Sequence, residues 1–130
     1  MNIDAIKREV LEAIARIDRN LETWRIRFEK NPVDALEWGD SAYEAAADWQ
    51  VANFVYHYIT YPRDDGKQPS KEELRNAMTK EFHRRAGKIG GSTNASHNMI
   101  EKFVVQAYSK FLDPQAFGFG LTLEKLFRNQ

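Results

Sequence analysis

The residues best suited to metal binding or proton transfer are three histidines, His57, His83 and His97. A di-iron helical bundle requires Glu-x-x-His on facing helices, and none of these histidines follows a glutamate at that spacing. They lie on different elements, so no zinc-ligand spacing is present, and the chain has no cysteine. The sequence therefore predicts no metal site and no cofactor.

A run of acidic residues, with no lysine or arginine between them, could bind a cation or a basic partner. The last three of its members recur every four residues, so they share one helical face if the first of them lies in or near the helix. Like charges at this spacing repel by about 0.2–0.5 kcal/mol per pair. A solvated helix start, a docking site for a basic partner and a divalent cation site all fit this pattern. We carry the docking site forward, and its residues are Asp34, Glu37, Asp40, Glu44 and Asp48.

A basic segment follows in the second half of the chain, where Arg84, Arg85 and Lys88 lead into Gly90 and Gly91. It is not a nucleotide-binding loop, because that motif places its lysine after the second glycine and directly before Ser or Thr. A helix-turn-helix fits better, with the basic residues at phosphates and a polar helix start at base edges. The candidate base-contacting residues are Ser92, Thr93, Asn94, Ser96, His97 and Asn98.

Two observations weigh against this nucleic-acid interpretation. The connection over residues 87–92 is longer than the three- to four-residue turn of a helix-turn-helix. Helix capping also explains Ser, Thr and Asn at a helix start. Nucleic-acid binding is therefore the alternative hypothesis, behind protein binding.

Helices must position all of these residues, and the first is the clearest. Apolar residues recur at three- and four-residue steps for over seven turns, which predicts a helix over 3–29 that is roughly 40 Å long. Such a helix overhangs a compact bundle, and the overhang is a surface for a partner or a second copy. Its periodic residues are Ile3, Ile6, Val10, Ile14, Ile17, Leu21, Trp24 and Phe28.

The central helix is predicted over 41–60. The stretch from Ala45 to Pro62 is apolar around most of the helical circumference, which is typical of a helix buried on several sides. Before it, Asn31 and Pro32 end the first helix and start a short one near 32–38, with Asn31 as its cap. Gly39 either ends this short helix or lies within one longer helix. A capping box at Ser41 and Glu44 favours the break.

Two further long helices are predicted over 71–86 and 95–112. Ser70 and Glu73 form a capping box for the first, and Asn98 with Glu101 offers one for the second. Short helices are expected near 114–117 and 122–128, and no stretch alternates with period two. The sequence thus predicts an all-α fold, a bundle of four main helices in a single domain over 1–130.

Composition narrows the class of protein further. The net charge is zero, but residues 1–65 sum to −5 and residues 66–130 to +5. A neutral total disfavours bulk attraction to nucleic acid and leaves a local basic face open. Charged residues interrupt the first twenty positions, so we expect no signal peptide, and no apolar run reaches membrane-spanning length. With no cysteine, the chain is expected to be cytoplasmic.

No nucleophile, base and orienting group can be assembled from the sequence, so we expect a protein that is not an enzyme. The leading hypothesis is a small adaptor, accessory subunit or inhibitor that binds another protein through its acidic helix face. The alternative is a nucleic-acid-binding module that uses the basic segment. A homodimer is a further hypothesis, either through the first helix or through the apolar C-terminal tail over 117–127, which otherwise folds over the bundle.

Overall fold

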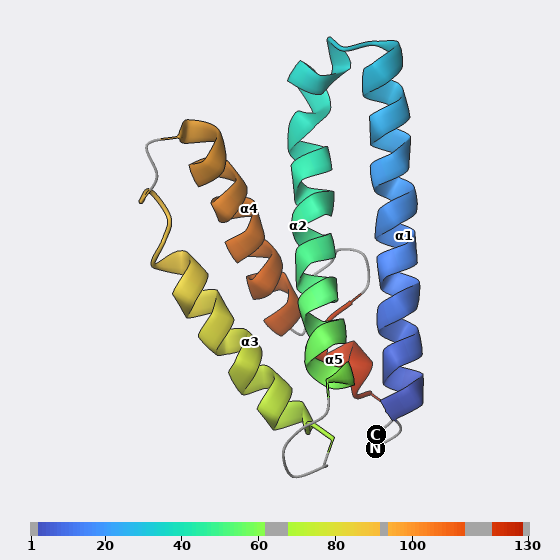
Figure 1. The fold of residues 1–130 in the computed structure, drawn as a ribbon, viewed down its shortest axis with the longest axis vertical. Coiled ribbons are helices and arrows are strands. Elements are labelled where there is room, and N and C mark those ends of the chain that lie inside the picture. Colours follow the sequence, from blue (N-terminus) through green and yellow to red (C-terminus); the bar gives the residue numbers. More distant parts are fainter. Residues whose placement is uncertain (1–2, 62–67, 92–93, 114–120, 129–130) are drawn as a thin grey trace.

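Two long helices, α1 (Ile3–Lys30) and α2 (Asp34–Thr60), form an antiparallel hairpin that runs the whole length of the molecule (Figure 1). α3 (Lys71–Ala86) and α4 (Ala95–Leu112) form a second, shorter hairpin, and α5 (Leu123–Leu126) is a single turn. This computed structural model describes residues 3–61, 68–91, 94–113 and 121–128. The predicted all-α bundle of four main helices is confirmed.

The predicted break at Gly39 is wrong, because α2 continues without interruption from Asp34 to Thr60. The short helix near 32–38 is therefore the beginning of α2. Packing on α1 holds both sides of the glycine in helical form: Trp38 stacks on Trp24 with ring centroids 6.4 Å apart, and Ala45 is buried. These tertiary contacts outweigh the cost of a glycine in a helix, which is about 0.5–1 kcal/mol.

The expected caps at this end are also absent. Ser41 lies inside α2, and α2 begins after Val33, which makes no capping hydrogen bond with its side chain. Asn31 instead donates from Nδ2 to Oδ1 of Asp34 at 3.3 Å. The turn between α1 and α2 is thus closed by hydrogen bonds across it rather than by an N-cap side chain.

α3 begins where the sequence predicts, with the Oγ of Ser70 accepting a hydrogen bond from the backbone N–H of Glu73 at 3.2 Å. The turn after α3 uses Gly90, whose φ of +81° lies in the left-handed region that favours glycine. At α4 the predicted cap at Asn98 is wrong. Asn94 caps the helix instead, and its Oδ1 accepts from the N–H of His97 at 3.1 Å.

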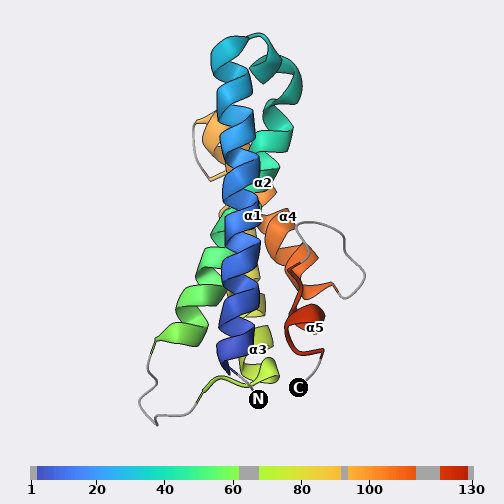
Figure 2. The same ribbon diagram turned by 90° about the vertical axis from the view of Figure 1, so that its right-hand side faces the viewer.

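The core lies where both hairpins and α5 meet. α2 packs between α1 and α4, and α3 packs along α4 on its far side (Figures 1 and 2). Among the described residues, the largest fully buried side chains come from α1, α2, α3, α4 and α5. They are Ile6, Val10, Ile17, Val55, Leu74, Met78, Val104, Tyr108, Phe111 and Leu123.

The C-terminal segment folds against this core over its described part, residues 121–128. Leu123 and Leu126 are buried, and Glu124 pairs with Lys71 of α3 at 2.8 Å and with Arg75 at 3.3 Å. The predicted helix near 122–128 is thus present as α5 followed by a turn. The predicted helix near 114–117 lies outside the described residues.

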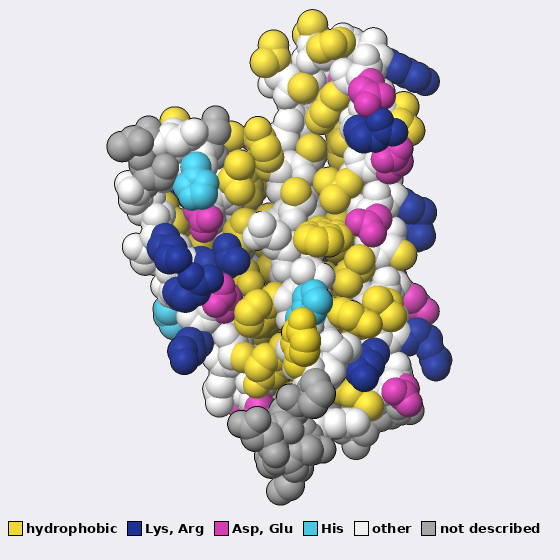
Figure 3. Space-filling model, in the orientation of Figure 1, with side chains coloured by type: hydrophobic (Ala, Val, Ile, Leu, Met, Phe, Trp, Pro, Cys, Tyr) yellow, Lys and Arg dark blue, Asp and Glu magenta, His cyan; other side chains and the backbone are white. Residues whose placement is uncertain are grey.

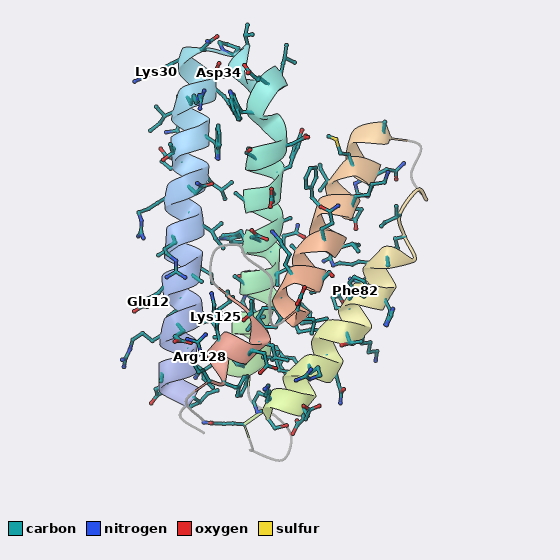
Figure 4. The ribbon with its side chains drawn as sticks, turned by 180° about the vertical axis from the view of Figure 1, so that it is seen from behind. Glu12, Lys30, Asp34, Phe82, Lys125 and Arg128 are labelled. Carbon is teal, nitrogen blue, oxygen red and sulfur yellow. The ribbon has the colours of Figure 1, made fainter. Side chains whose placement is uncertain are left out.

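The upper end of the α1–α2 hairpin projects beyond the α3–α4 hairpin, as both ribbon views show. Lys30 and Asp34 mark this end, while Lys125 and Arg128 lie toward the opposite end (Figure 4). The overhang expected for the first helix is therefore present, and α2 shares it. Of the helices in the described ranges, none has the length and apolar character needed to traverse a membrane.

Candidate functional site

The five acidic residues of the predicted docking site all lie on α2, but the structure gives them different surroundings. Asp34 belongs to the turn. Its Oδ2 accepts from Nε of Arg27 at 2.9 Å, and its Oδ1 accepts from Asn31. Because this carboxylate is already paired within the chain, it holds the turn in place and is not left for a partner.

Glu44 and Asp48 share one cation across the α2–α4 contact. The Nζ of Lys110 lies 3.3 Å from Oε1 of Glu44 and 3.0 Å from Oδ1 of Asp48. The Asp48 side chain is only 12% exposed, against 59% for Glu44. Burial raises the pKa of Asp48 and nearby Glu44 raises it further, while the ammonium of Lys110 lowers it without cancelling the effect of burial. Asp48 is thus part of the helix packing, and Glu44 stands at its edge.

Glu37 and Asp40 are exposed, and neither has a hydrogen bond or ion pair with any residue that the structure describes. They lie on the projecting part of α2, about one and two turns above Glu44, the first acid of the pair that contacts Lys110. Among the five acids of the prediction, these two face solvent without a partner in the described part of the chain. The available acidic edge is therefore Glu37 and Asp40, with Glu44 at its lower limit.

Beside this edge lies an apolar surface that we call the open face: Leu36, Tyr43, Met99 and Ile100. Leu36 and Tyr43 share one side of α2 with buried Ala47, at spacings of seven and four residues. Ile100 likewise precedes buried Val104 and Ala107 of α4 by four and seven residues. Lower down these two stripes meet, where Tyr43 packs on Phe103 with ring centroids 6.1 Å apart.

Toward the projecting end the two stripes separate and are left in solvent. Leu36 is 88% exposed, and Tyr43, Met99 and Ile100 are each between 37% and 38% exposed. Figure 3 shows hydrophobic side chains gathered on the facing sides of α2 and α4 and at the projecting end. The open face thus continues the core beyond the point where the described helices cover it.

An aromatic cluster behind the open face fixes the position of α2. Trp24 of α1 packs on Phe28 and on Trp38 of α2, and the guanidinium carbon of Arg27 lies 5.4 Å from the centroids of both tryptophan rings. The same arginine pairs with Asp34. These contacts hold the upper ends of α1 and α2 together without help from α3 or α4.

The arginines of the basic segment are paired within the chain. Arg84 forms an ion pair with Glu81, and Arg85 lies 3.0 Å from Glu81 and 3.8 Å from Glu101. These arginines lower the pKa of Glu81, mainly through the hydrogen bond from Arg84. Arg85 also lies over the ring of Tyr108 at 5.7 Å. Both arginines therefore join α3 to its own acids or to α4, rather than standing as free phosphate contacts.

The other residues of the predicted nucleic-acid site are dispersed. Lys88 is exposed beyond the end of α3, Asn94 caps α4, and His97 lies 3.9 Å from Glu101. Asn98 is half-buried in the first turns of α4, while Ser92 and Thr93 lie outside the described residues. α3 and α4 run side by side in opposite directions (Figure 1), whereas a helix-turn-helix crosses its helices at about 90–120°.

No group of three or more His, Cys, Asp or Glu residues in the described ranges is placed to hold a metal ion. Comparison with protein-family models, curated proteins and solved structures finds no match to this chain. The candidate site therefore rests on its own geometry.

Reasoning from the sequence missed the apolar residues of the open face. The signal was present, because Leu36, Tyr43 and Ala47 follow a helical spacing that runs through Gly39. A helix break at Gly39 hides this spacing, and a continuous α2 reveals it. Ile100 carries the same helical spacing with Val104 and Ala107, but this spacing predicts burial and does not show that Ile100 stays partly exposed.

Proposed function

We propose that this protein is a non-catalytic binding protein, of the adaptor, accessory-subunit or inhibitor type, that recognises another protein through its open face. The observation that carries the proposal is Leu36, which is 88% exposed although it continues the stripe of α2 that α4 covers lower down. Burying one leucine side chain is worth about 1.5–3 kcal/mol. A contact surface that covers the open face would gain this free energy.

The acidic edge of the open face adds charge selectivity. Glu37 and Asp40 have no partner among the described residues, and Glu44 is 59% exposed despite its contact with Lys110. A partner with basic residues beside an apolar surface complements both properties. The acidic docking site is thereby narrowed from five residues to three. A cytoplasmic setting fits a chain without cysteine.

Affinity capture with matched variants tests this proposal. Tagged wild-type protein, Leu36→Lys and a control variant, Leu11→Lys, are used as baits in parallel, and captured proteins are quantified by mass spectrometry. Leu11 is also exposed, but it lies on α1 far from the projecting end. We expect at least one protein that wild type and Leu11→Lys retain equally and that Leu36→Lys loses at least tenfold.

Two outcomes contradict the proposal. Either every captured protein is retained equally by the three baits, or the Leu11→Lys control loses the same proteins as Leu36→Lys. Circular dichroism of each bait excludes a folding defect, which is not expected because substitutions at exposed helix positions usually change stability by less than about 0.5 kcal/mol.

The alternative hypotheses keep their status as predictions. Arg84 and Arg85 each pair with Glu81, so a phosphate that binds either arginine would have to compete with that ion pair. A homodimer through α1 or the C-terminal tail is addressed by light scattering over a range of protein concentrations. The exposed apolar residues of the open face support neither nucleic-acid binding by the basic segment nor a homodimer through α1 or the C-terminal tail.

A further inference from the structure

The packing of α4 on α2 indicates what kind of partner segment could bind the open face. α4 runs in the same direction as α2 (Figure 1). Its Phe103 ring packs against the ring of Tyr43. From the same helix, Lys110 reaches across to Glu44 and Asp48. α2 is thus covered by a helix that supplies apolar side chains to its stripe and an ammonium group to its acids.

The projecting part of α2 repeats the spacing between acidic and apolar positions that α2 has where α4 packs on it. Asp40 precedes Tyr43 by three positions, as Glu44 precedes Ala47. Glu37 follows Leu36 directly, as Asp48 follows Ala47. Since equal spacings on a helix give equal angular positions, the acids stand on the same side of the apolar stripe in both places. In the upper copy, α4 covers Tyr43 only in part through Phe103, and Leu36 is left 88% exposed.

From this repetition we infer that the partner contributes an amphipathic helix with basic residues along one edge, which lies on Leu36 and Tyr43 and pairs with Glu37 and Asp40. Met99 and Ile100, at the upper end of α4, form the other side of the seat. The helix extends the cover that α4 provides lower down. Helices that lay an apolar face into a groove commonly do so through anchors at positions i, i+3 or i+4, and i+7. This inference rests on the proposed function and specifies its partner.

Selection from a displayed library of amphipathic helices tests the inference directly, since it requires only the purified protein. The library keeps apolar residues at i, i+3, i+4 and i+7, and its flanking positions encode Lys, Glu or Gln. Wild-type protein is expected to enrich helices with Lys along one edge. The variant Glu37→Lys/Asp40→Lys is expected to enrich helices with Glu at the same positions and to bind the Lys-rich helices about tenfold more weakly.

A charge control separates this result from a general effect of net charge. Glu9→Lys/Glu12→Lys makes the same charge change on α1, where both residues are exposed and Glu12 points away from the bundle (Figure 4). This control should enrich the same Lys-rich helices as wild type and bind them with unchanged affinity. An equal loss in both double variants overturns the inference.

The variant Leu36→Asp distinguishes failure of the inference from failure of the proposed function. Helices that lose binding with Leu36→Asp but show no preference for Lys contradict the inferred partner and leave the open face as a binding surface. Helices that bind Leu36→Asp as well as wild type contradict both. Failure to enrich any helix also overturns the inferred partner. Enrichment only through self-association of the protein, seen by light scattering, would assign the face to a second copy instead.

Discussion

The two ends of the α1–α2 hairpin are built from the same pair of helices and yet differ in what covers them. At the lower end α2 is buried by α1 and α4 at once, and Val55 has no exposed surface. At the upper end Leu36 is 88% and Val33 66% exposed. Apolar side chains of α2 continue beyond the point where the described helices bury them. This difference is the basis of our proposal that the upper end binds a partner protein, which would cover the exposed part of the core.

The two ends also differ in how their charges are used. Lys110 pairs with both Glu44 and Asp48 at the α2–α4 contact, while Asp40 and Glu37, about one and two turns above Glu44, have no partner among the described residues. An acidic cluster that looks uniform in the sequence is therefore divided between helix packing and a free edge. Three experiments probe the comparison between the ends, in order of decreasing effect.

The largest loss of stability is expected when a buried side chain in the covered part of the bundle is replaced by alanine. Phe111→Ala removes a buried ring of α4 and should lower the free energy of unfolding by about 3–5 kcal/mol, since it leaves a cavity in the core. Leu36→Ala at the open face should change it by less than about 0.5 kcal/mol. Urea denaturation measures both. Equal losses for the two variants would mean that Leu36 is buried in solution and would contradict the comparison.

A smaller and local effect is expected from Trp38→Ala. This change removes the stacking on Trp24 and one of the two rings beneath Arg27, contacts worth about 1–2 kcal/mol together. Because they join only the upper ends of α1 and α2, hydrogen exchange should accelerate over residues 24–40. Exchange in α3 should stay as in wild type. Uniform acceleration over all helices would show that the projecting end is not a separate unit of stability.

A pH-dependent effect is expected at Asp48. Its pKa is raised in the folded protein above the ordinary value of about 3.9, so ionisation occurs at lower pH in the unfolded chain. The contribution of Asp48 to the free energy of unfolding is therefore largest at low pH, where the carboxyl group is protonated. This contribution falls as the pH rises through the raised pKa. Asp48→Asn should gain stability relative to wild type between about pH 3 and pH 7. Glu37→Gln, which removes an exposed carboxylate outside the α2–α4 contact, serves as the matched control.

Denaturant unfolding at several pH values measures the Asp48 effect. Lys110→Met should steepen the fall in the stability of the folded state with pH, because it removes the cation that lowers the pKa of Asp48. If Asp48→Asn loses stability relative to wild type as the pH rises, Lys110 outweighs burial and the pKa of Asp48 is lowered rather than raised.

Much of the fold could be predicted because local signals and tertiary packing agree. The apolar period of α1, the cap at Ser70 and the bounds of α3 and α4 all follow from residues close in sequence. Gly39 is where the two disagree. A glycine two residues before a serine indicates a helix end locally, but Trp24 stacks on Trp38 from fourteen residues away and keeps α2 continuous.

The candidate site was predictable only in part, for a related reason. The acids could be identified from the sequence, but their pairing depends on Lys110, which follows Asp48 by sixty-two residues. Local spacing could not show that α4 would reach Glu44 and Asp48 and stop short of Glu37 and Asp40. The arginines of the basic segment are similar, since the contact of Arg85 with Glu101 depends on how α3 packs against α4.

The most direct test of the central claim is site-specific photo-crosslinking from the open face. A benzophenone amino acid replaces Leu36 in one protein and Leu11 in another, and both are expressed in the native host and irradiated. We expect a covalent adduct with another protein from position 36 that does not form from position 11. If position 36 gives no adduct, or if both positions give the same one, the open face does not bind a partner protein.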